Sequence, residues 1–135
     1  MEDEDLLAKF EDASLPRACF HHEEHVRIAF LYLHRYPLLE VLARFPAALR
    51  RYAAALGKIG LYHETISWAY IFVIRERIAG AASEQTWEQF KRCNSDLFDG
   101  EKSILKEYYR EETIASQAAR EGFVMPDRWL GRDRT

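Results

Sequence analysis

The stretch LYHETISWAYIFVIRERIA, residues 61–79, constrains the fold most strongly, because it is apolar on nearly every side until Arg75. A helix that is apolar all round is buried, either inside a protein or in a membrane. Arg75, Glu76 and Arg77 interrupt the run, which leaves it too short to span a bilayer. The sequence therefore predicts that residues 61–79 form the central helix of a helical domain.

The rest of the chain has the same helical periodicity, and no segment alternates with period two between hairpin turns. The pattern predicts further helices over residues 3–12, 21–35, 38–56 and 84–93, with Ser83 as the cap of the last of these, and two short ones over 101–110 and 113–120. Pro46 predicts a kink or a split within its helix. The expected fold is all-α, a compact bundle of four to five helices with short extra C-terminal helices. An irregular tail that follows Gly122 packs back onto it.

The length of 135 residues fits one domain with its own core. Within it we expect an acidic N-terminal helix and loop (1–16), a helical core (20–95), and short helices with a tail (96–135). The net charge of −3 argues against a nucleic-acid partner, which needs a basic face. The first residues lack the apolar run of a signal peptide, and two cysteines are too few for a disulfide framework. These features favour a reduced cytoplasmic location and no membrane partner.

Histidines gather at the start of two predicted helices. At about 100° per residue, His22 and His25 share the buried face of the helix over 21–35, one turn apart. His21 lies about 100° round from His22 and is the weaker candidate. His63 lies in the first turn of the central helix, on its inward stripe. The first and third helices of an up-down bundle run parallel, so both clusters are expected at the same end.

Three neutral imidazoles that leave a fourth position open form a common mononuclear metal site. Imidazole suits iron, zinc, nickel and copper alike, so the pattern predicts one divalent metal ion without naming it. Glu64 and Tyr62 are the expected catalytic residues, as a base or an orienting group beside the metal. The sequence has no E-x-x-H and no H-E-x-x-H, which argues against a di-iron carboxylate centre and against the common metalloprotease helix.

Each of these residues also has a structural interpretation. A buried histidine near a helix end is usually hydrogen-bonded by the protein rather than bound to a metal. The Glu64 carboxylate is favoured by the positive end of the helix dipole whether or not it is a ligand. Tyr62 is a normal packing aromatic at the rim of a bundle. The sequence leaves both interpretations open.

Three segments, residues 20–33, 62–65 and 123–127, resemble the pattern F-x-H-x-x-H-[LV]-R-x-A-[WF]-x-Y-L, Y-H-E-T and F-V-x-P-D of a group of small all-helical bacterial proteins. The first histidine pair of that pattern matches His22 and His25. The resemblance implies a polar site that these two histidines share with the Y-H-E-T residues. The group is defined by a sequence pattern rather than by an activity, so the resemblance does not indicate which reaction is catalysed.

Asp127 enters as a possible site residue through this resemblance alone. Its alternative role is that of a structural clamp that holds the C-terminal segment. The two roles differ in whether the carboxylate contacts a ligand or the protein itself.

Three functions are consistent with the sequence. The first is a small metal-dependent enzyme, a hydrolase or an oxidoreductase, which acts on a small polar metabolite at one end of the bundle. The second is a metal-free protein that binds a small molecule or assists another protein, with histidines that are structural. The third is an assembly role in which an apolar helix face completes a homodimer. Metal content separates the first from the others, and the mass in solution tests the third.

Overall fold

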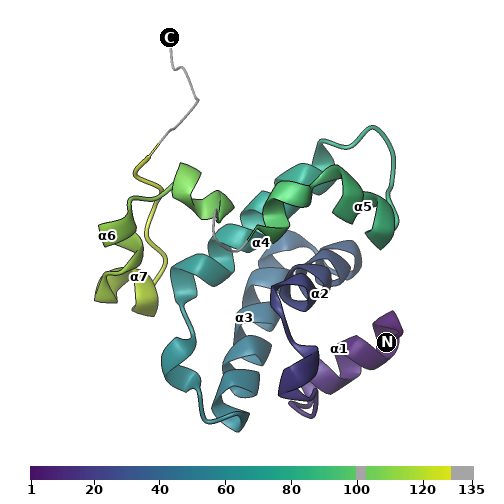
Figure 1. Ribbon diagram of the computed structural model, residues 1–135, viewed down its shortest axis with the longest axis horizontal. Helices are drawn as coiled ribbons and strands as arrows, with labels where there is room; N and C mark the ends of the chain where they lie inside the picture. Colours follow the sequence, from purple (N-terminus) through teal and green to yellow (C-terminus); the bar gives the residue numbers. More distant parts are fainter. Residues whose placement is uncertain (100–102, 129–135) are drawn as a thin grey trace.

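The computed structural model describes residues 1–99 and 103–128, and within these ranges it is helical with no strand (Figure 1). The α-helices are α1 (Asp3–Glu11), α2 (His22–Arg35), α3 (Leu38–Ala55), α4 (Glu64–Ala79), α5 (Trp87–Cys93), α6 (Glu111–Ile114) and α7 (Gln117–Glu121). Four 3-10 helices join them: η1 (Arg17–Cys19), η2 (Ile59–Leu61), η3 (Ser95–Phe98) and η4 (Ile104–Glu107). The predicted compact all-α fold is confirmed.

Helix α4 is the central element, as its apolar sequence predicts. It packs against α2 and α3 on one side and against η4 and α7 on the other (Figure 1). Its buried residues cover about two thirds of the helix circumference: Thr65, Ser67, Ala69, Tyr70, Ile71, Val73 and Ile74. Of the helices in the described ranges, α4 included, none combines the length and the apolar character that crossing a membrane requires.

The core between α1, α2 and α3 is built from aromatic side chains. Phe10 of α1 is fully buried and lies 5.7 Å from Phe45 and 5.8 Å from Tyr52, measured between ring centroids. The Tyr52 hydroxyl donates a hydrogen bond of 2.9 Å to the Leu15 carbonyl, so its polar end is satisfied inside the core. Full burial of such a side chain contributes roughly 1.5–3 kcal/mol. These contacts hold the N-terminal helix against the bundle.

Two helices differ in detail from the prediction. Helix α3 continues through Pro46 as one helix, so the predicted split is wrong, whereas the predicted kink stays a prediction; the buried proline ring packs in the core, which offsets the loss of a backbone donor. Helix α5 is capped by Thr86 rather than by Ser83. Thr86 Oγ1 accepts from Gln89 N at 3.2 Å, and the Gln89 side chain accepts from Thr86 N at 2.9 Å. This reciprocal pair needs a glutamine or glutamate three residues after the cap, which Ser83 lacks.

The C-terminal third forms shorter elements than the periodicity predicts. A helix is expected over 101–110. Residues 103–110 form only the short helix η4 and the turn after it, and residues 101–102 lie outside the described residues. The helix expected over 113–120 is divided into α6 and α7, because the Ser116 hydroxyl accepts from Ala119 N at 3.1 Å and starts a new helix. Gly122 ends α7 in an extended conformation.

The tail after Gly122 packs back onto α4, as expected. The buried Thr65 hydroxyl donates to the Gly122 carbonyl at 2.8 Å and accepts from Val124 N at 3.0 Å. The ring of Phe123 stacks on Trp68 with centroids 5.4 Å apart. One polar side chain at the start of α4 therefore anchors a segment almost 60 residues further along the chain. Trp129, the next aromatic residue of the tail, lies outside the described residues.

Replacing Thr65 by valine keeps the size of the side chain but removes both hydrogen bonds to the tail. The variant should lose about 1–3 kcal/mol of unfolding free energy, because two backbone groups lose their partner in a largely buried place. Chemical denaturation measures the loss, and hydrogen exchange of the Val124 amide measures the release of the tail. Amides of α1, on the other side of α4, serve as the control. Unchanged protection of Val124 would contradict this role of Thr65.

Candidate functional site

A cavity of about 510 Å³ lies where the start of α2 meets the middle of α4 and the segment that follows η3. We call it the histidine cavity. Helix α2 contributes His22 and His25 to its lining, and α4 contributes Ile66 and Tyr70. Side chains between residues 103 and 114, together with Arg128, form the remaining wall.

His22 is the first residue of α2, and a distant backbone group fixes its ring. Nε2 donates a hydrogen bond of 2.7 Å to the carbonyl of Leu97 in η3. The ring also lies edge-on to Tyr70, with centroids 5.2 Å apart. His22 therefore joins α2 to η3 and to α4 while its ring borders the cavity.

His25 is the one histidine in the described part of the chain with a buried ring nitrogen that lacks a hydrogen-bond partner. Its ring stacks on Phe45 at 5.4 Å and meets His22 edge-on at 6.0 Å. Nε2 is shielded from solvent and has no hydrogen-bond partner in the described residues. Burial, with a smaller contribution from His22, lowers the pKa of His25 to about 4, so the ring is neutral at pH 7. An unsatisfied buried polar group costs about 1–3 kcal/mol, which a suitable ligand would recover.

His63 is the N-cap of α4, and both of its ring nitrogens have partners. Nδ1 accepts from Ile66 N at 3.1 Å, and Nε2 donates to the carbonyl of Ile114 at 2.7 Å. The residue thus satisfies one of the free N–H groups at the helix start and ties α4 to the end of α6. Its ring borders a neighbouring cavity of about 360 Å³, which we call the α3–α4 cavity.

The three histidines of the predicted metal site border two adjoining cavities. His25 and Ile66 line both, so the starts of α2 and α4 lie on the same side of the bundle. Within residues 1–99 and 103–128, no three His, Cys, Asp or Glu side chains are grouped so that they could hold a metal ion. A site made of His22, His25 and His63 requires His63 to give up at least one of its two hydrogen bonds. The three-histidine metal site stays a prediction.

Tyr62 and Glu64 contact each other. The Tyr62 hydroxyl donates to Glu64 Oε1, and Arg50 Nη1 donates to the same oxygen at 3.2 Å. Burial first, and then the bond to Glu64, raises the pKa of Tyr62, so its hydroxyl is a hydrogen-bond donor at neutral pH. Tyr62 lines the α3–α4 cavity, whereas Glu64 is part of the lining of neither this cavity nor the histidine cavity.

His21 and Asp127 make contacts that are structural in character. His21 is the exposed N-cap of α2, and its backbone N–H donates to Glu24 Oε1 at 2.8 Å. Asp127 is exposed and accepts from Arg110 N at 2.9 Å and from the Thr113 hydroxyl. The bond from Thr113 is the main cause of the lowered pKa of Asp127. These contacts support the interpretation of Asp127 as a clamp on the C-terminal segment.

The histidine cavity also contains residues that sequence reasoning missed. The Tyr70 hydroxyl lies 3.0 Å from Ser103 Oγ, and burial raises the pKa of Tyr70. The charged groups on the cavity wall are Lys106, Arg128 and Glu111. Tyr70 has a sequence signal, because it continues the helical stripe of His63. The other four have none, since they reach the cavity only through the folding of the C-terminal third.

No family model, no curated protein and no solved structure matches this chain. The resemblance to the bacterial pattern therefore stays a prediction, and the geometry of the cavities carries the functional argument.

The low pKa of His25 makes stability depend on pH. The unfolded chain takes up a proton on this residue near pH 6.5, whereas the folded protein does so only near pH 4. Stability from this group is therefore present above pH 6.5, falls as the pH drops towards 4, and levels off below. A difference of this size corresponds to about 3 kcal/mol. Denaturation curves at pH 7, 5.5 and 4.5 measure it, and the pKa follows from NMR titration of the ring.

The matched pair of variants is His25→Phe, which cannot titrate, and His34→Gln on the exposed end of the same helix. The first should lose this component of the acid sensitivity, and the second should keep it. An NMR pKa of His25 near 6.5 would show that the ring is solvated and would contradict the assignment.

Proposed function

We propose that this chain binds a small organic acid in the histidine cavity. The observation that carries the proposal is that His25, whose buried Nε2 has no hydrogen-bond partner in the described residues, lines a cavity of about 510 Å³. Ligand sites commonly have volumes of roughly 300–1,000 Å³ and place a few polar groups on a mostly apolar wall. The χ2 torsion of histidine is broad, so a modest rotation of the ring turns this nitrogen towards a ligand.

The other polar groups of the cavity favour an anionic ligand. Lys106 and Arg128 bring two positive charges to the lining and Glu111 one negative charge, which leaves the wall net positive. The hydroxyls of Tyr70 and Ser103 add hydrogen-bonding groups within 3.0 Å of each other. A carboxylate matches this combination, because it accepts charge-assisted hydrogen bonds from each of these donors.

The apolar part of the ligand has its own surface. Ile66, Leu105 and Ile114 line the cavity beside the polar groups. Burying a ring or a short alkyl chain against them contributes about 25 cal/mol per Å² of apolar surface. The ligand class is therefore a small aromatic or branched monocarboxylate. A cytoplasmic location, which the reduced cysteines favour, belongs to the same proposal.

The metal-dependent enzyme expected from the sequence stays a prediction, as does the homodimer. Purified protein with about one metal ion per chain, lost in His63→Ala, would support the enzyme and replace the present proposal. Benzoate binding that survives treatment with a chelator supports metal-free recognition. The mass in solution tests the dimer separately.

Benzoate is the first probe, with benzamidine as the cationic molecule of the same shape. Benzoate should bind in the millimolar range, at least about tenfold more tightly than benzamidine, and should shift the amide signals of Tyr70, Leu105 and Ile114. His25→Phe should weaken benzoate binding about tenfold, the value of one hydrogen bond to a charged group. The same variant should raise the unfolding free energy by about 1 kcal/mol, because it removes an unsatisfied polar atom. Titration by NMR and denaturation at pH 7 measure the two effects.

His34→Gln is the control, since it changes a histidine of the same helix outside the cavity. Benzoate binding that is equal in wild type and His25→Phe would remove His25 from the site. Equal binding of benzoate and benzamidine would refute the preference for an acid. A large loss of stability in His25→Phe would show that the imidazole has a structural partner.

A further inference from the structure

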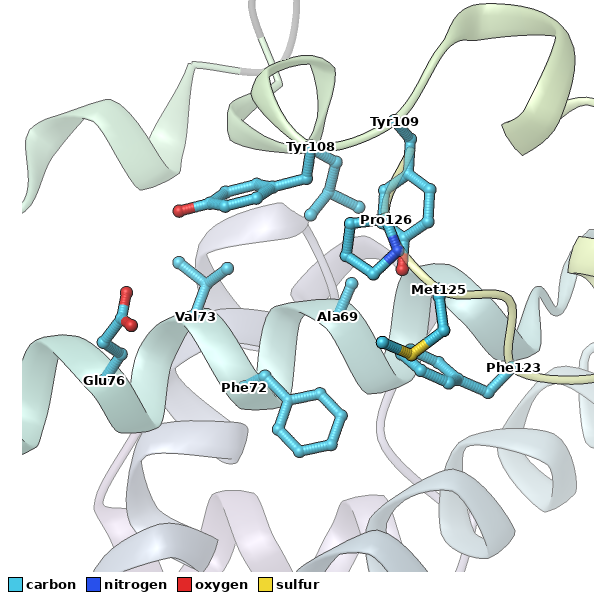
Figure 2. Close-up of a pocket in the computed structure, with 10 residues that line it drawn as sticks. Ala69, Phe72, Val73, Glu76, Tyr108, Tyr109, Phe123, Met125 and Pro126 are labelled. Carbon is cyan, nitrogen blue, oxygen red and sulfur yellow. The ribbon is translucent and has the colours of Figure 1, made fainter. Parts of the chain in front are cut away.

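A separate cavity of about 300 Å³ lies beside the histidine cavity. Leu105 and Tyr109 lie between the two cavities, because each of these residues lines both of them. Its floor is one face of α4 from Ala69 to Glu76 (Figure 2). Its walls are Tyr108 on one side and the tail residues 123–126 on the other. We call it the aromatic groove, and none of the predicted site residues borders it.

The floor of the groove is a regular helical stripe that the fold leaves partly open. Phe72 and Val73 lie three and four residues after Ala69 and four and three residues before Glu76, which places all of them on one face of α4. Phe72 is 37% exposed, and Met125, which faces it across the groove in Figure 2, is 71% exposed. Large apolar side chains left open around a concavity are typical of binding sites.

Glu76 is the one charged side chain in the described lining of the groove. In Figure 2 it extends from α4 on the side of the helix that carries Val73, below the ring of Tyr108. Its neighbour Arg77 is held by Asp96 and Asn94, to which it donates hydrogen bonds of 2.8 Å and 2.9 Å. The groove thus has an apolar end and an anionic end.

The helix itself makes the anionic end more negative. Glu76 lies in the last turn of α4, which ends at Ala79. The unpaired carbonyl groups of a last turn carry the negative end of the helix dipole, which favours a cation nearby. Aromatic rings add a second attraction, because their faces are negative and hold ammonium groups. Tyr108 supplies such a ring on the side of the groove that carries Glu76.

We propose that the aromatic groove binds a small organic ammonium ion that carries an apolar body. The ammonium group lies between Glu76 and Tyr108, and the apolar body lies over Phe72, Val73 and Met125. The volume equals that of about ten water molecules at ~30 Å³ each, which fits about nine or ten non-hydrogen atoms. Ala69 and Glu76 are about 10 Å apart along the helix axis, which fits an arylalkylamine.

The test uses three probes of nearly equal shape: 2-phenylethylamine, which is a cation at pH 7, neutral 2-phenylethanol and anionic 3-phenylpropanoate. NMR titration of the full chain gives the affinity and the location of each. The amine should bind in the millimolar range, about fivefold more tightly than the alcohol, with amide shifts at Val73, Glu76 and Met125. The anion should bind most weakly at these residues. The size of the preference follows from one exposed ion pair and one cation–π contact.

Glu76→Gln should remove the ion-pair part of the preference, so that the affinity for the amine falls to within about twofold of that for the alcohol through the remaining cation–π contact, and it should leave the affinity for the alcohol unchanged. Phe72→Ala should weaken both probes. Glu88→Gln, on the exposed face of α5, is the matched control and should change neither. Four results would each overturn the proposal. The wild type could bind the amine and the alcohol equally, or bind the anion more strongly than the amine. The amide signals could shift only at other residues, or could show no shift at 20 mM amine. Benzoate binding and amine binding are measured from the amide signals of different residues. The proposal for the aromatic groove is therefore tested independently of the proposal for the histidine cavity.

Discussion

The burial of most of the circumference of α4 is the constraint on which the rest of the fold depends. A helix with apolar residues all round needs cover on every face, and α2 and α3 leave one side open. The short C-terminal elements cover that side, and Thr65 and His63 fix where they attach through bonds to Gly122 and Ile114. The histidine cavity and the aromatic groove form along the boundary between these two halves, where long regular helices meet short irregular ones.

Hydrogen-bond satisfaction separates the two inward-facing histidines that the sequence treats alike. His63 has a partner for each ring nitrogen and behaves as a helix cap that also joins two elements. His25 stacks among aromatic rings, and one of its ring nitrogens has no hydrogen-bond partner. The burial of this unpaired nitrogen lowers the stability of the folded protein. In most proteins the buried polar side chains have hydrogen-bond partners within the fold, and the side chains that lack them tend to occur at functional sites. This contrast is why His25 carries the proposed function and His63 does not.

The two proposed sites share a wall and have opposite charge preferences. Leu105 and Tyr109 stand between them, and the Tyr109 hydroxyl donates to the Val124 carbonyl at 2.7 Å. Burial raises the pKa of Tyr109 to about 12, so this donor is present at any physiological pH. Tyr109 thereby fixes the tail segment that forms one wall of the aromatic groove. A side chain that borders one cavity thus helps to shape the other.

The sequence by itself determined the helical fold, the central place of residues 61–79 and the shared face of His22 and His25, because helical periodicity is a local property. It also marked Tyr70, which continues the stripe of His63. It left open whether His63 binds a metal or caps a helix, since both roles place a histidine in a first turn. Only the tertiary structure decided which partners the polar groups find. Ser103 and the carbonyl of Ile114 contact Tyr70 and His63 across 30 residues or more, and no local pattern encodes contacts over such distances.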